Sequence, residues 1–183
     1  MRSRSILTIP VALAAVLVPG PAQARDASHV SSADTDPDFC GAGLSVAVTE
    51  EADLSLVARP ADARSATAWT LWSSGTVTWT GTASGRVVTM TYRVADRDLK
   101  VTDNGDGTRT IHAMNNRLET YVGPDGTTYR NRGPQWVDVV VSDAGTPADP
   151  LDDFVVELLS YRQGGNWDLA GGWCDQMVSW LRG

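Results

Sequence analysis

Residues 99–130 read LKVTDNGDGTRTIHAMNNRLETYVGPDGTTYR, and this stretch decides the fold. Two clusters of glycine, asparagine and aspartate, at 103–107 and 123–126, interrupt segments rich in threonine, valine and tyrosine. Such clusters are typical of hairpin turns, and β-branched and aromatic residues favour strands. We therefore expect two consecutive β-hairpins, with strands over 99–102, 108–113, 118–122 and 127–130.

Similar β-prone runs lie on both sides of this stretch. They cover 44–48, 67–72, 76–80, 87–94, 136–141 and 154–159. Short runs with turn residues about every 10 positions are typical of a sandwich or barrel. Because consecutive strands are usually neighbours, we expect a mainly β fold, a single antiparallel meander that forms a sandwich or barrel.

The C-terminus follows a helical period instead. Trp173, Met177 and Trp180 fall at i, i+4 and i+7, and Cys174 begins a parallel stripe. This spacing predicts a short C-terminal helix of about ten residues. A helix this short is marginal alone, so it must pack on the sheet.

The N-terminus has the three parts of a secretory signal peptide. Arg2 and Arg4 precede an apolar run, and Ala22-Gln23-Ala24 resembles a cleavage site. The run falls short of the ~20 residues that span a bilayer, although an uncleaved membrane anchor is the alternative. We expect a signal peptide over 1–24, a flexible polar spacer over 25–38 and one β-rich domain over 39–183.

The protein is therefore expected outside the cell or in the cell wall, with no membrane attachment after cleavage. Two cysteines, Cys40 and Cys174, in an exported chain predict a disulfide. The alternative is a pair of reactive thiols, but no histidine or basic cluster flanks either residue to lower its pKa.

The formal net charge of −7 makes nucleic acid and anionic membranes poor partners, because both need a basic surface, and we expect no nucleic-acid partner. We expect a monomer whose partner is an unknown ligand or an extracellular protein, and no cofactor.

Several turn motifs give the chain a family likeness. They are Asn104-Gly105-Asp106-Gly107-Thr108, Gly145-Thr146-Pro147-Ala148-Asp149-Pro150, and Asp152-Asp153, followed by a late cysteine before a short helix. This pattern resembles a group of small, uncharacterised secreted proteins of actinobacteria. The resemblance implies a secreted β domain and carries over no active site.

Two acidic segments are candidate cation or acid–base sites. Loop 103–107 resembles a calcium loop, but glycines occupy two of the positions that should supply oxygen ligands, so we expect a hairpin turn. Asp149, Asp152 and Asp153 could bind a cation or transfer protons, or could simply be a solvated loop.

His112 is the one histidine expected within the domain, and a histidine can act as a general base. The chain has neither a G-x-S-x-G nor an H-E-x-x-H motif, and a zinc site would need at least two more ligands. The sequence therefore predicts no catalytic, cofactor-binding or metal-binding residue.

Seven tryptophans are the most unusual feature of the composition. If Ser74-Gly75 formed a two-residue turn, Trp72 and Trp79 would share the core face and Trp69 would lie on the other. Trp69 is therefore our candidate ligand contact, although tryptophans also serve as core residues.

These observations favour a secreted, non-catalytic β module that binds a cell-wall glycan or a protein. One alternative is a small secreted hydrolase that uses Asp152 or Asp153 with His112. Another is an inhibitor of a second secreted protein.

Overall fold

The computed structural model describes residues 25–61, 66–142, 145, 153–169 and 172–183. Its elements are β1 (Arg25–Asp36), the 3-10 helix η1 (Phe39–Gly41), β2 (Val46–Arg59), β3 (Ala68–Gly81), β4 (Val87–Asp103), β5 (Thr108–Val122), β6 (Thr128–Ser142), β7 (Phe154–Gln163), β8 (Asn166–Trp167) and α1 (Trp173–Arg182). Strands β1 to β7 pair in sequence order, each antiparallel to the next, and β8 pairs with β6. The expected meander with a short C-terminal helix is confirmed.

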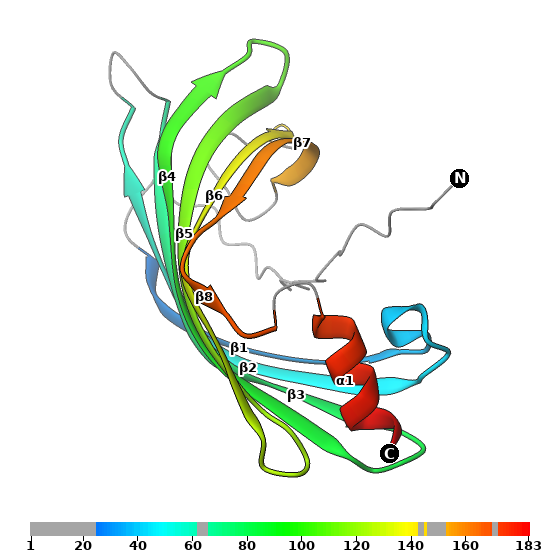
Figure 1. Cartoon of the computed structure of the whole chain (residues 1–183). Helices are drawn as coiled ribbons and strands as arrows, with labels where there is room; N and C mark the ends of the chain where they lie inside the picture. The colour runs from blue at the N-terminus through cyan, green and yellow to red at the C-terminus, as the bar shows by residue number, and fades with distance from the viewer. Residues whose placement is uncertain (1–24, 62–65, 143–144, 146–152, 170–171) are drawn as a thin grey trace, which may run out of the picture.

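The strands form one strongly curved sheet, and α1 lies on its concave side near one end (Figure 1). Among the described residues there is no second layer of strands, and β1 and β7 are the two unpaired ends of the path. The protein is thus an open curved sheet rather than a two-layered sandwich. Alternate side chains of each strand point to the concave and the convex face.

The hydrophobic core lies between α1 and the concave face. Helix residues Met177 and Leu181 are fully buried there, as are Val46 of β2 and Val88 of β4. Trp79 packs against Tyr121, with ring centroids 6.3 Å apart. The helical stripe expected from the sequence is therefore the surface that closes this core.

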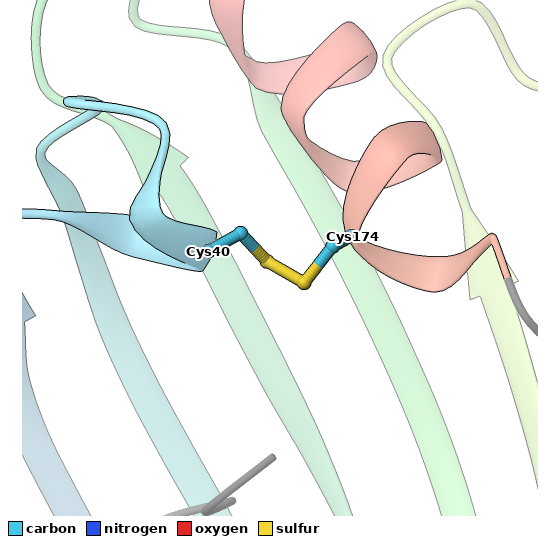
Figure 2. The surroundings of a disulfide bond; sticks show 2 residues. All are labelled: Cys40 and Cys174. Atoms are coloured by element: carbon cyan, nitrogen blue, oxygen red, sulfur yellow. A yellow bond between two sulfur atoms is a disulfide. The ribbon is translucent and has the colours of Figure 1, made fainter. Parts of the chain in front are cut away.

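A disulfide between Cys40 and Cys174 joins η1 to the first turn of α1 (Figure 2). The two Cα atoms are 5.7 Å apart, within the usual range for a bridge. The predicted pairing is confirmed. It holds the connection between β1 and β2 to the C-terminal helix.

The expected spacer over 25–38 is wrong for residues 25–36, which form β1. Residues Ser28 to Asp36 pair in unbroken register with Leu54 to Val46 of β2. The segment looked disordered because its side chains are polar. An edge strand needs few apolar side chains, because backbone hydrogen bonds to β2 hold it and most of its surface meets water.

The expected hairpin turn at Ser73-Ser74-Gly75 is also wrong, since β3 runs straight through it and turns only after Gly81. Gly75 has no positive φ. A Cβ atom there would lie 2.3 Å from the backbone oxygen of Glu51. This glycine therefore permits a close approach of β2 rather than a turn.

The same error exchanged the faces of Trp69 and Trp72, whereas Trp79 lies on the core face as expected. Trp69 and Trp79 are ten residues apart on one strand, so both lie on the concave face. Trp72 lies on the convex face with 41% of its surface exposed. The turns at 104–107 and 123–126 are where the sequence predicted them, but the strands that they join are longer than expected.

Candidate functional site

The concave face has a cavity of about 220 Å³ at the end of the sheet away from α1, which we call the end cavity. Its apolar wall consists of side chains from five neighbouring strands, namely Leu56, Leu71, Val101, Ile111 and Val141. Its polar lining consists of Thr67, Trp69, Asp96, Asp98, Arg109 and Asp153. The cavity therefore combines an apolar wall with an ionisable one.

A bulge in β4 creates this mixture. Asp98 lies opposite Ala113, but Lys100 lies opposite His112, so Leu99 is an extra residue in the ladder. An extra residue reverses the side-chain alternation beyond it. Asp96 and Asp98 before the bulge and Val101 after it therefore all face the cavity, and 50% of Leu99 is exposed.

The two aspartates of β4 are carboxyls in a low-dielectric environment. Burial raises the pKa of Asp98 to about 6, and the nearby Asp96 and Asp153 act in the same direction. The backbone N–H of Trp69, 2.8 Å from Asp98 Oδ2, and Arg109 partly oppose this shift in pKa. Burial also raises the pKa of Asp96, against a hydrogen bond from the Asn115 side chain.

Arg109 and Asp153 form an ion pair at the cavity wall. Arg109 Nη2 is 2.6 Å from both carboxylate oxygens of Asp153, and the two side chains are only 7% and 11% exposed. Breaking such a buried pair by removing one partner typically costs several kcal/mol. The pair therefore fixes the start of β7 against the sheet at the cavity wall.

Trp69 contributes an unsatisfied donor. Its indole Nε1 atom is buried and has no hydrogen-bond acceptor in the described part of the chain. Leaving a buried donor unpaired costs about 1–3 kcal/mol. A bound molecule with an acceptor atom would remove this cost, so Trp69, the predicted ligand contact, lies at a site with an unmet hydrogen bond.

A second depression, which we call the outer trough, crosses the convex face with a volume of about 840 Å³. Trp72, Arg93 and Arg132 contribute to it. All three side chains are exposed, so its polar groups are already hydrated. Because Trp72 is exposed in it, the outer trough serves as the comparison site for the end cavity.

His112 and Asp153 are not brought together. His112 Nδ1 lies 2.8 Å from Asp138 Oδ1 on the convex face, and Ser160 donates to Asp138 Oδ2 at 2.7 Å. Asp153 belongs to the concave side through Arg109. Asp138 therefore contacts both His112 and Ser160 and lies between them. In this arrangement His112 does not accept a proton from Ser160.

The other acidic candidates give no metal site. In loop 103–107 the carboxylates bind their own backbone, with Gly105 N donating to Asp103 at 2.8 Å and Thr108 N to Asp106 at 3.0 Å. No cluster of three potential metal ligands occurs in the described ranges. Asp149, Asp152 and the predicted signal peptide lie outside the described residues.

Sequence reasoning missed Asp96, Asp98 and Arg109. The one signal was the pair of acids two positions apart in a β-prone run, which places both carboxyls on one face of a strand. Arg109 carried no signal, because the buried ion pair joins residues 44 positions apart.

No family model, curated protein or solved structure matches the chain. In the stretches that the structure describes, no helix is long and apolar enough to cross a membrane. The function must therefore be argued from the end cavity itself.

Proposed function

We propose that this protein is an extracellular, non-catalytic binding module whose end cavity holds one terminal sugar unit of a glycan. The observation that carries the proposal is the buried indole N–H of Trp69, which has no acceptor among the described residues, in the same cavity as the carboxyls of Asp96 and Asp98. The disulfide between Cys40 and Cys174 supports an oxidising location outside the cytoplasm.

A sugar hydroxyl matches this polar lining because it donates and accepts at the same atom. It can donate to the Asp98 carboxylate and accept from the Trp69 indole. The C–H face of the ring can contact the apolar wall near Leu71. At about 220 Å³ the cavity is smaller than the 300–1,000 Å³ of typical ligand pockets, so it suits one ring at a chain end.

A small organic cation is the competing ligand, since Asp96 and Asp98 supply two carboxyls to one Arg109 that already binds Asp153. Ionic strength separates the two classes. Added salt screens the attraction between charges but leaves hydrogen bonds to a neutral sugar almost unchanged. We favour the sugar because it also satisfies the indole donor.

The test is saturation-transfer NMR with a panel of bacterial wall and plant glycans, followed by titration of the best ligand. We expect Trp69→Phe to weaken binding about tenfold, because it keeps the ring and removes one buried hydrogen bond. Trp72→Phe in the outer trough is the matched control and should leave affinity unchanged.

Three results would count against the proposal. Binding that Trp72→Phe weakens and Trp69→Phe does not would move the ligand to the outer trough. Binding that falls steeply with salt would indicate a cationic ligand. A panel with no binder at millimolar concentration would remove the glycan assignment.

A hydrolase is the second candidate, and the raised pKa of Asp98 favours it. A carboxyl with a pKa of about 6 beside a second carboxyl can serve as a general acid near neutral pH. Incubation with the bound glycan decides between the two. Release of product that Asp98→Asn abolishes would establish an enzyme, and an intact glycan after prolonged incubation would support the binding module.

A further inference from the structure

Strand β7 is the most apolar exposed element of the molecule. Six of its ten residues are large and hydrophobic, and each is about half exposed or more: Phe154, Val155, Val156, Leu158, Leu159 and Tyr161. Along its length β7 pairs with β6 on one side only in the described chain. A continuous apolar run is typical of a strand that is covered on both faces, and here it lies at an open edge.

The opposite edge of the sheet shows the usual protection. Strand β1 reads RDASHVSSADTD, so charged and hydroxyl side chains dominate it. Polar edge strands discourage pairing with other chains, whereas apolar ones template it. The difference indicates that the β7 edge, and not the β1 edge, is suited to pair with a further strand.

We propose that β7 pairs antiparallel with β7 of a second copy of this chain, which joins two sheets into one across a two-fold axis. This surface is separate from the end cavity and does not depend on what that cavity binds. The proposal replaces the monomer expected from the sequence.

Charge complementarity selects the register. Centring the axis between Leu159 and Ser160 places Glu157 of one protomer opposite Arg162 of its partner. The two-fold axis repeats this opposite-charge pair. Cross-strand pairs of opposite charge stabilise a sheet, whereas like charges placed opposite destabilise it.

The faces of the sheet also match in this register, because β7 has an extra residue at Leu159. Glu157 lies opposite Val140 of β6, and Arg162 lies opposite Trp136, so both point to the convex face. Arg162 already lies 4.1 Å above the Trp136 ring. Without the bulge, positions 157 and 162 would point to opposite faces and could not meet.

The concave side of the same register is apolar. Leu158 lies opposite Val139 and Tyr161 opposite Val137, so both point to the concave face. The two-fold axis then places Leu158 of each protomer beside Tyr161 of the other. Side chains that are 59% and 51% exposed in one chain thus become contacts between the two chains.

The experiment is sedimentation equilibrium of the oxidised, signal-free chain from micromolar to millimolar concentration. We expect a reversible monomer–dimer equilibrium. Glu157→Arg or Arg162→Glu alone should raise the dimer dissociation constant about tenfold or more, because two attractive pairs become repulsive. The double variant should return it to within about threefold of the parent, as coupled sites do in a double-mutant cycle.

Arg97→Glu is the matched control, an equal change of charge on the convex, exposed side of β4 away from β7. It should leave the dimer unchanged. Circular dichroism of every variant checks that the sheet is intact. A parent chain that stays monomeric at all concentrations would overturn the proposal, and so would a dimer that the double variant fails to restore.

Discussion

Gly123 has no side chain because the indole of Trp180 occupies the space that one would need. A Cβ atom at this position would lie 2.4 Å from Trp180 Cε2, and the ring is in the core. We expect Gly123→Ala to lower the free energy of unfolding by about 1–3 kcal/mol, the usual cost of overpacking. Urea denaturation measures it.

The matched control for this substitution is Gly172→Ala at the start of α1, where an added Cβ meets nothing within 4 Å. It should change stability by less than about 1 kcal/mol. If both variants lost the same free energy of unfolding, the close contact with Trp180 would not be the reason that residue 123 has to be glycine.

At the scale of secondary-structure elements, the stability of α1 depends on its contacts with the rest of the protein. It has ten residues and no side-chain N-cap, so its stability comes from the core and from the Cys40–Cys174 bridge. The bridge joins positions 134 apart in the chain. We expect Cys174→Ser to lower stability by about 2–5 kcal/mol, because the unfolded chain regains the freedom that the loop removed.

Denaturation with and without reductant measures this loss. The double variant Cys40→Ser/Cys174→Ser should be no less stable than the single variant, and reductant should affect neither. A parent protein whose unfolding is insensitive to reductant would contradict a stabilising bridge.

At the scale of the whole molecule, the concave face divides into a helix-covered core and the end cavity. The cavity end carries an electrostatic cost, because burial raises the pKa of Asp98 to about 6 from the ~3.9 of an unfolded chain. The folded protein therefore holds this proton more tightly than the unfolded chain. The contribution of this tighter proton binding to the free energy of unfolding is fully present below about pH 4. It is lost as the pH rises through about 6.

We expect the parent to lose about 1–3 kcal/mol of stability relative to Asp98→Asn between about pH 4 and pH 7. Chemical denaturation at a series of pH values gives the difference between the two proteins. Asp34→Asn on exposed β1 is the control and should run parallel to the parent. A difference between parent and Asp98→Asn that does not change with pH would contradict the buried, titrating carboxyl.

Short-range patterns in the sequence by themselves determined two hairpin turns, the C-terminal helix and the disulfide. Turns at 104–107 and 123–126, the helix at 173–182 and the cysteine pair follow from short-range signals, namely glycine conformations, the helical period and an even cysteine count. Each depends on residues close together in the chain or on composition alone. That is why those predictions could be made from the sequence alone and are confirmed by the structure.

Tertiary structure decided the rest. Gly75 resembles a turn in sequence but lies mid-strand because the backbone of β2 approaches there, and residues 25–36 became a strand only through pairing with β2. The end cavity needs the Leu99 bulge and an ion pair between Arg109 and Asp153, residues distant in sequence. Register, bulges and long-range contacts depend on which strands meet, and no local pattern encodes that.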